Sequence, residues 1–220
     1  MINIENNTPK RKLKKTFRSV TGYFPSIKND RSMAFESLLE KQLFLSLEFD
    51  DTVDSYLEQP VKIEYFVQGR KRSYHPDCLV SYKERKQKLI EVKYTDDLDK
   101  NIQEFSARFD AANEYAKNNN MTFEIFTEKE ISHIKLQNFT FLYSFASMQL
   151  TKQETDMITK IVQSAGSISV VDLLNELSTS RYEQAKQLPF IWKMIFNGKL
   201  KTDFENSELK MDSIVTKGIR

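Results

Sequence analysis

The chain has 220 residues, of which 40% are hydrophobic and 16 are phenylalanine; its formal net charge is only +2. This composition excludes an intrinsically disordered chain, and the length allows one large domain or one domain with a smaller companion. The single cysteine excludes an internal disulfide, and with only two histidines a structural zinc site has little basis. No apolar run suits a membrane span or a signal peptide, so we expect a soluble cytoplasmic protein with no membrane partner.

The N-terminal part of the chain is strongly basic. Residues 10–18, KRKLKKTFR, hold six basic side chains and no acid. Such a segment either contacts the phosphate backbone of nucleic acid or is a solvated tail, and we assign residues 1–30 to a basic arm. The motifs GxGxxG, GxxxxGK[ST] and GxSxG are all missing from the sequence, which leaves nucleotide-binding folds and serine hydrolases without support.

After a turn-rich segment at 22–30, residues 32–50 predict a helix. Its apolar residues recur at helical spacing: Phe35, Leu38, Leu39, Leu43, Phe44 and Leu47. Three extended segments follow, at 61–68, 74–82 and 88–94. The first is predicted to end in a tight turn, and the polar turn KERKQ joins the other two into a β-hairpin.

Residues 97–118 predict a second amphipathic helix. Its apolar stripe comprises Ile102, Phe105, Phe109, Ala112, Tyr115 and Ala116. A strand at 121–128, a short helix at 129–137 and a strand at 138–145 are expected next. The resulting order, α-β-β-β-α-β-α-β, predicts an α/β domain over residues 31–150, with a mixed sheet flanked by helices.

Near residue 150 the composition changes. Thr151 and Glu154 have the spacing of a capping box at the start of a helix. Helices are predicted at 151–166, 169–178 and 181–198, the last interrupted or restarted at Pro189. The segments KLKTDF and ELKMDSIV predict a hairpin. Residues 151–220 should therefore form a small helical domain similar in outline to a winged helix.

The predicted hairpin carries charged residues at informative positions. Glu91 and Lys93 are two residues apart in a strand, so they share one face, and Asp77 follows Pro76 where the other strand begins. Alternating charged and apolar residues also occur in any half-solvated strand. A preceding helix that contains Glu40 favours a site instead, because helix glutamate, P-D and E-x-K together form the pattern of the PD-(D/E)xK nuclease fold.

These residue types suit the hydrolysis of a phosphodiester. Carboxylates are hard oxygen ligands that hold Mg²⁺ or Mn²⁺, and such a metal neutralises charge on the phosphate and provides hydroxide at neutral pH. Lys93 would orient or deprotonate the attacking water and add positive charge near the transition state. The predicted catalytic residues are Glu40, Asp77, Glu91 and Lys93. The predicted metal ligands are Glu40, Asp77, Glu91 and Val92.

The sequence also resembles the TnsA endonucleases of transposons that have a two-protein transposase. The resemblance runs over about residues 17–145, through RSVTGYFPSIKND, SLLEKQLFLSLEF, YHPDCLV, IEVKY and FEIFTEKEI, and is weaker in the helical tail. It implies a restriction-endonuclease-like fold. It also implies that the helix glutamate lies eight residues before Glu48, which selects Glu40 over its competitor Glu36, one turn earlier.

The resemblance further implies a function in transposition. TnsA-like enzymes cut the 5′ ends of the element in double-stranded DNA, a TnsB-type transposase cuts and joins the 3′ ends, and a TnsC-type ATPase regulates the complex. Two alternatives remain: a stand-alone restriction or repair nuclease, and an assembly module that mainly docks TnsB and TnsC. The stretch Pro189–Trp192 is a candidate docking surface, although its aromatic residues could equally belong to a domain core.

Overall fold

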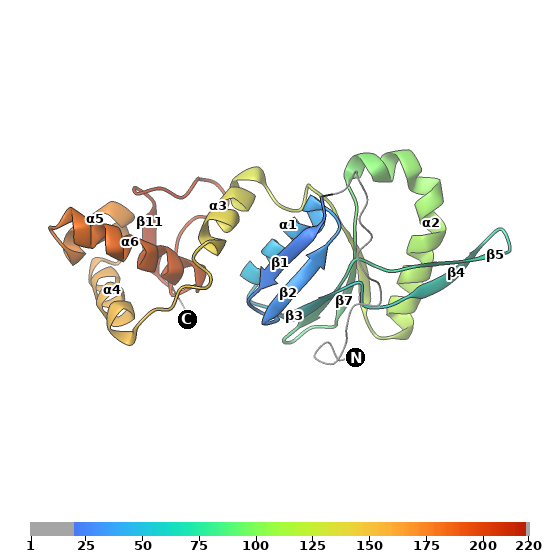
Figure 1. The fold of residues 1–220 in the computed structure, drawn as a ribbon, viewed down its shortest axis with the longest axis horizontal. Helices are drawn as coiled ribbons and strands as arrows, with labels where there is room; N and C mark the ends of the chain where they lie inside the picture. The colour runs from blue at the N-terminus through green and yellow to red at the C-terminus, as the bar shows by residue number, and fades with distance from the viewer. Residues whose placement is uncertain (1–19, 219–220) are drawn as a thin grey trace. The chain divides into compact units, whose positions relative to one another are not determined.

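The structure is a computed structural model that describes residues 20–218 (Figure 1). The basic segment at 10–18 lies outside the described residues, so its predicted contact with nucleic acid stays a prediction. The chain divides into two compact units, the first ending at Glu130 and the second beginning at Ile131. This division precedes the predicted boundary at residue 150, because residues expected to form the last strand of the first domain are a helix of the second unit.

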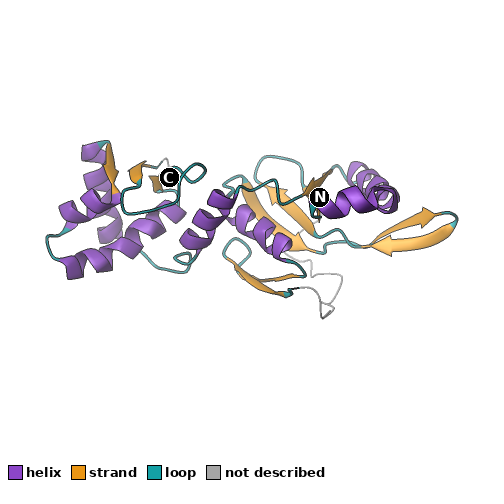
Figure 2. Cartoon of the chain, turned by 90° about the horizontal axis from the view of Figure 1, so that it is seen from above, coloured by secondary structure: helices purple, strands orange, loops and turns teal. Residues whose placement is uncertain are grey.

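The first unit contains helices α1 (Leu38–Phe49) and α2 (Thr95–Asn118) and strands β1 (Gly22–Ser26), β2 (Arg31–Phe35), β3 (Val53–Glu58), β4 (Ile63–Val67), β5 (Arg70–Tyr74), β6 (Cys78–Tyr82), β7 (Lys88–Val92) and β8 (Thr122–Phe126). Its main sheet has the order β3-β6-β7-β8. The pairs β3–β6 and β6–β7 are antiparallel, whereas β7–β8 is parallel. The predicted mixed sheet is therefore confirmed. The hairpins β1–β2 and β4–β5 lie outside it, as Figure 2 shows.

The two helices cover opposite faces of this sheet. The ring of Tyr56 in β3 stacks on Phe44 of α1, with 5.4 Å between ring centroids. Leu79 and Leu89 instead join a core cluster with Ala112 and Ala116 of α2. Tyr56 pairs with Val80, the neighbour of Leu79, and successive residues of a strand face opposite ways. A packed core thus supports both sides of the strands that carry the predicted site.

The N-terminal part of this unit differs from the prediction. Helix α1 begins at Leu38 and not at residue 32, because the Oγ of Ser37 caps it by accepting a hydrogen bond from the Glu40 N–H at 3.1 Å. The segment before Ser37 is strand β2, which pairs with β1 in a hairpin where a turn-rich segment was expected. Strand β3 was not predicted. Its apolar run is short and begins only four residues after the end of α1, so the sequence pattern does not separate it from the helix.

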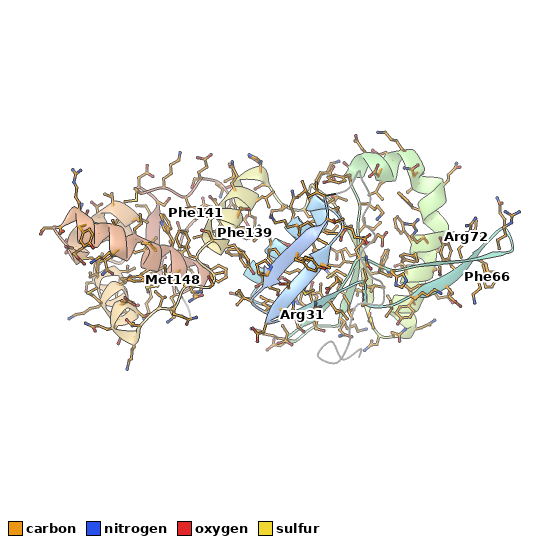
Figure 3. All side chains as sticks on the ribbon, viewed as in Figure 1. Arg31, Phe66, Arg72, Phe139, Phe141 and Met148 are labelled. Atoms are coloured by element: carbon orange, nitrogen blue, oxygen red, sulfur yellow. The ribbon has the colours of Figure 1, made fainter. Side chains whose placement is uncertain are left out.

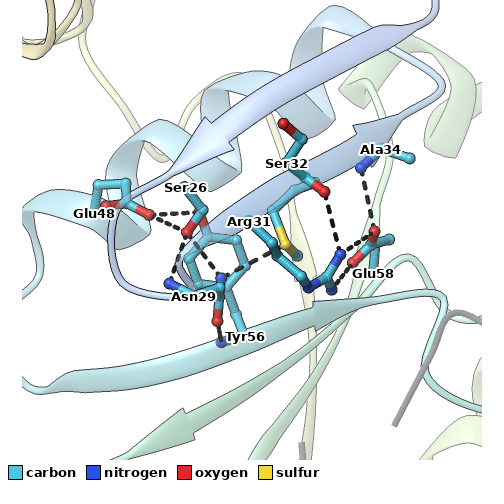
Figure 4. Close-up of polar contacts among 9 residues, drawn as sticks. Ser26, Asn29, Arg31, Ser32, Ala34, Glu48, Tyr56 and Glu58 are labelled. Carbon is cyan, nitrogen blue, oxygen red and sulfur yellow. Dashed lines mark hydrogen bonds and ion pairs between the residues drawn. The ribbon is translucent and has the colours of Figure 1, made fainter. Parts of the chain in front are cut away.

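Two buried carboxylates hold the β1–β2 hairpin in place (Figure 4). Glu48 of α1 accepts hydrogen bonds from the hydroxyls of Ser26, at 2.6 Å, and Tyr56, at 2.7 Å, and from two backbone N–H groups. Glu58 of β3 binds both terminal nitrogens of Arg31, at 2.9 and 2.5 Å, and the backbone N–H of Ala34. Both side chains are therefore structural.

The second unit contains helices α3 (His133–Tyr143), α4 (Lys152–Ala165), α5 (Val170–Leu177) and α6 (Arg181–Phe196) and strands β9 (Ser167–Ser169), β10 (Leu200–Lys201) and β11 (Ile214–Lys217). The strands form an antiparallel sheet in the order β10-β11-β9. The predicted capping box at Thr151 and Glu154 is present at the start of α4. Helices α4, α5 and α6 with the small sheet match the predicted winged-helix outline, with β9 added to the expected hairpin.

Two predictions for the second unit were wrong. Residues 138–143, expected in a strand, belong to α3, in which Figure 3 labels Phe139 and Phe141. The ring of Phe141 packs edge-on against that of Trp192, with 5.1 Å between ring centroids. Helix α6 also continues through Pro189 without a break, since burial of Ile191, Met194 and Ile195 outweighs the backbone hydrogen bond that proline cannot donate. Trp192 is only 4% exposed and is a core residue, which removes it from the candidate docking surface.

Among the described residues, no helix is both long and apolar enough to span a membrane.

Candidate active site

The candidate site lies where β6 begins and β7 ends. Leu79 and Leu89 face α2, and alternation places Asp77, two residues before Leu79, and Glu91, two residues after Leu89, on the same face. The backbone N–H of Gln59 donates to the carbonyl of Asp77 at 3.0 Å, which fixes the chain just before β6. The fold therefore converts a spacing in sequence into two acids on neighbouring strands.

Lys93 is the centre of this group. Its Nζ lies 2.8 Å from Glu91 Oε1, 2.8 Å from the carbonyl oxygen of Val92 and 3.7 Å from Asp77 Oδ2. The backbone N–H of Val92 donates to Asp77 Oδ2 at 2.7 Å. The structure thus brings Asp77, Glu91, Val92 and Lys93 together. The ammonium contacts oxygens of three residues that were predicted to be metal ligands.

Glu40 reaches the site from the start of α1. It is the third residue of the helix, and its carboxylate accepts hydrogen bonds from the backbone N–H of Glu36 at 2.9 Å and from the Ser37 hydroxyl at 3.0 Å. Burial, followed by the negative charge of Asp77, raises the pKa of Glu40 to about 7. The negative charge of Glu36 also raises the pKa of both Glu40 and Asp77, so both competing glutamates are electrostatically coupled to Asp77.

The pKa of Glu91 is raised in the same way, and Glu91 is more deeply buried than Glu40. Its side chain is 2% exposed, and burial together with Asp77 raises its pKa to about 7, against the opposing effect of Lys93. Burial likewise raises the pKa of Asp77. Burial alone would lower the pKa of Lys93, but the charges of Asp77 and Glu91 outweigh it and raise that pKa. The acids repel one another, and the ammonium compensates them only in part.

Sequence reasoning missed a second cation, Arg108 of α2. Its Nη1 lies 3.5 Å from Glu91 Oε1, and its guanidinium carbon lies 5.4 Å from the Tyr74 ring centroid and 5.0 Å from that of Phe105. Both cations approach Oε1 of Glu91, whereas the buried Oε2 accepts no hydrogen bond within the described chain. The available signal was a basic residue three positions after Phe105, beside the apolar stripe of the helix.

The donor set fits a hard divalent cation in its chemistry. It offers carboxylate oxygens, the carbonyl of Val92 and the unpartnered Oε2 of Glu91, and mutual repulsion of the acids is what a metal would relieve. In residues 20–218, however, no three Asp, Glu, His or Cys side chains already converge as a metal cluster. Glu40 and Asp77 instead accept hydrogen bonds from backbone N–H groups, and Glu91 contacts Lys93 and Arg108.

A mixed sheet covered by helices, with acids and a lysine on adjacent strands, defines a restriction-endonuclease-like domain. Two family models match the chain: TnsA-like endonuclease N terminal over residues 50–128, and TnsA endonuclease C terminal over residues 130–204. The chain therefore belongs to the TnsA endonuclease family, and it is a DNA endonuclease of transposition. The two matches meet where the two units divide. Comparison with curated proteins gives no match.

Most of the candidate site lies within the N-terminal match. Asp77, Glu91, Lys93 and Arg108 are inside residues 50–128, whereas Glu40 precedes them. Both Glu40 and its competitor Glu36 are electrostatically coupled to Asp77, so the choice of Glu40 depends on its position eight residues before Glu48.

Proposed function

We propose that this chain is a metal-dependent endonuclease that cuts the 5′ ends of a transposon, with Glu40, Asp77, Glu91 and Lys93 at its catalytic centre. The observation that carries the proposal is the position of the Lys93 ammonium, which contacts Asp77, Glu91 and the carbonyl of Val92. Carboxylate and carbonyl oxygens of this kind would suit a hard divalent cation. A structural ion pair alone would not account for the unpartnered Oε2 of Glu91.

Glu40, Asp77, Glu91 and the carbonyl of Val92 would hold Mg²⁺ or Mn²⁺. The bound metal would supply charge stabilisation at the phosphate and a hydroxide nucleophile. The chain's own residues prepare this site, because burial, followed by the negative charge of Asp77, raises the pKa values of Glu40 and Glu91. A fixed arrangement of this kind costs no reorganisation when the substrate arrives.

Lys93 would act as a hydrogen-bond donor to the attacking water or a phosphate oxygen. Its pKa is raised by Asp77 and Glu91, so it is protonated at neutral pH while those acids are its neighbours. A protonated lysine cannot take a proton from water, which favours orientation and charge stabilisation over general-base catalysis. Arg108 would be a positioning residue, since it contacts Glu91 Oε1 and leaves Oε2 available.

The match to the TnsA endonuclease C terminal supports a partner-dependent enzyme. We propose that a TnsB-type transposase presents the transposon end to this chain, and that a TnsC-type ATPase binds the complex. The alternative of a stand-alone restriction or repair nuclease predicts specific cutting by the isolated chain. A pure assembly module predicts that the site residues can be replaced without loss of cleavage.

A strand-specific cleavage assay separates these possibilities. End-labelled transposon-end duplex is incubated with Mg²⁺ and the chain, with and without the TnsB-type protein. We expect 5′-end cleavage only with the partner, and none with Asp77→Ala. Glu40→Gln and Glu36→Gln form a matched pair, of which only Glu36→Gln should retain substantial activity. Full activity in Asp77→Ala would overturn the site, and efficient specific cutting without a partner would overturn the partner dependence.

A further inference from the structure

The β4–β5 hairpin is a two-stranded ribbon that extends away from the main sheet (Figure 1). Its strands pair from Ile63–Tyr74 at the base to Val67–Arg70 at the tip. The connecting residues Gln68 and Gly69 have φ values of 49° and 73°, so both lie in the left-handed region. A two-residue turn of this kind matches the natural twist of a hairpin, and the two strands stay paired up to the turn.

The base of the ribbon is anchored beside the candidate active site. Ile63 is buried in the cluster formed with Leu79, Leu89 and α2. Tyr74 packs edge-on against Tyr65, with 6.0 Å between ring centroids, and also faces the guanidinium of Arg108, which contacts Glu91. Asp77 follows Tyr74 by three residues in the chain. The orientation of the ribbon is therefore tied to the site.

The outer part of the ribbon is basic and exposed. Residues 61–74 contain four basic side chains, Lys62, Arg70, Lys71 and Arg72, and one acid, Glu64. Glu64 already pairs with Lys71 at 2.6 Å and with Lys62 at 3.9 Å. Arg70 and Arg72 are exposed and form no ion pair within the described residues. The ribbon thus presents two uncompensated guanidinium groups.

An exposed aromatic side chain lies on the opposite face of the ribbon. Phe66, labelled in Figure 3, is 70% exposed. It pairs with Lys71 across the ribbon, so these two side chains share a face. Alternation places Arg70 and Arg72 on the other face. A large exposed apolar side chain on a basic ribbon has no role in the core of this unit.

We propose that the β4–β5 ribbon is a DNA-contacting arm, with Arg70 and Arg72 on backbone phosphates next to the cleavage position and Phe66 against the sugar or base edges. Arginine binds phosphate through two parallel hydrogen bonds, and the width of the major groove admits a two-stranded ribbon. Positive charge without acidic partners complements the DNA backbone better than it complements a protein surface of mixed charge. The inference rests on the proposed function, since it assigns part of the substrate contact of the same enzyme.

The test uses the full chain and a transposon-end duplex in buffer with EDTA, so that binding is measured without cleavage. Arg70→Gln/Arg72→Gln is compared with Lys41→Gln/Lys117→Gln, which removes the same charge from exposed positions on α1 and α2. Fluorescence anisotropy is followed over a range of salt concentrations. The ribbon variant should bind about tenfold more weakly, and its salt slope should fall by about two, because each neutralised phosphate contributes about 0.9.

The control variant Lys41→Gln/Lys117→Gln should retain the wild-type salt slope. Phe66→Ser should weaken DNA binding but leave the salt slope unchanged, because it removes no charge. An unchanged melting temperature establishes that the exposed substitutions leave the fold intact. Should the double variant unfold, Arg70→Gln and Arg72→Gln are each expected to lower the slope by about one.

The outcomes separate the inference from the function on which it rests. Wild-type protein that neither binds nor cuts the duplex, even with a TnsB-type partner, would overturn the proposed function. Wild-type binding and cleavage with an unchanged salt slope in the ribbon variant would overturn the ribbon assignment alone. Unchanged DNA binding with loss of partner stimulation would also overturn it, and would make the ribbon a protein-docking element.

Discussion

The first unit contains two sets of buried glutamates in very different surroundings. Glu48 and Glu58 accept hydrogen bonds on both carboxylate oxygens, from hydroxyls, backbone N–H groups or a bidentate arginine. Glu91 has one oxygen with no hydrogen bond, and both Glu40 and Glu91 have pKa values raised to about 7 by burial and by Asp77. Burial alone thus does not distinguish a structural acid from a functional one. Glu40 also accepts a hydrogen bond on each oxygen, so what Glu40 and Glu91 share is burial beside the negative charge of Asp77.

The difference has an energetic meaning. A buried carboxylate whose oxygens are all bonded contributes to stability, whereas acids held together against their repulsion lower it. Groups whose pKa values are shifted by burial and by a neighbouring charge cluster at functional sites. The contrast predicts opposite effects when each set is altered.

The largest expected effect is on stability. Glu48→Ala leaves the hydroxyls of Ser26 and Tyr56 and two backbone N–H groups without their acceptor. We expect the free energy of unfolding to fall by about 3 kcal/mol. Glu91→Gln, which removes the charge of a site acid and keeps the size of its side chain, should leave stability equal or raise it above pH 7. Denaturant unfolding in EDTA measures the free energy of unfolding of both variants. Equal destabilisation by the two would contradict the distinction between the structural and the functional glutamates.

A smaller effect concerns pH. Between about 4.5 and about 7 the folded protein binds more protons than the unfolded chain, because the folded-state pKa values of Glu40 and Glu91 are raised. Their contribution to stability is complete at pH values below 4.5 and is lost as pH rises through 7. The slope per carboxyl is at most about 1.4 kcal/mol per pH unit.

Unfolding of wild type and Glu91→Gln at pH 5 and pH 8 in EDTA measures the contribution of Glu91, since titrating groups that are not coupled to Glu91 cancel in the difference. The variant should lose less stability than wild type on going to pH 8. The negative charge of Asp77 reinforces the raised pKa of Glu91, whereas Lys93 and Arg108 oppose it. A larger loss in the variant would contradict the direction of the raised pKa.

The smallest effect concerns Arg108. Its charge lowers the pKa of Glu91, so Arg108→Met should raise that pKa further. Since a metal binds the deprotonated acid, Mn²⁺ binding should weaken about threefold at pH 6.5 and converge with wild type at pH 9. Arg108→Lys, which keeps the charge, should restore most of the binding. A merely structural role would instead weaken binding equally at both pH values.

Much of the site could be predicted because it depends on strand geometry. Alternation alone places Glu91 and Lys93 on one face, and the structure has their charged groups 2.8 Å apart. The mixed sheet followed in the same way from the order of the elements. These inferences succeed since period-two alternation is a local property of the chain.

The missed features depend on contacts between distant segments. Arg108 meets Glu91 only because α2 packs on that face of the sheet. The aromatic run in α3 has high strand propensity, but it is helical because Phe139 and Leu142 pack into the second unit. The start of α1 was placed too early, since apolar residues of β2 happen to continue the helical spacing.

Metal binding tests the central claim most directly, because it requires no partner and no DNA. Mn²⁺ is titrated calorimetrically into wild type, Asp77→Asn and the control Asp54→Asn, which changes an exposed acid of β3. We expect wild type and Asp54→Asn to bind Mn²⁺ with equal affinity and to gain thermal stability from it, and Asp77→Asn to do neither. Binding by Asp77→Asn as tight as that of wild type, or no binding by wild type, would contradict the assignment of Asp77, Glu91 and Glu40 as a metal site.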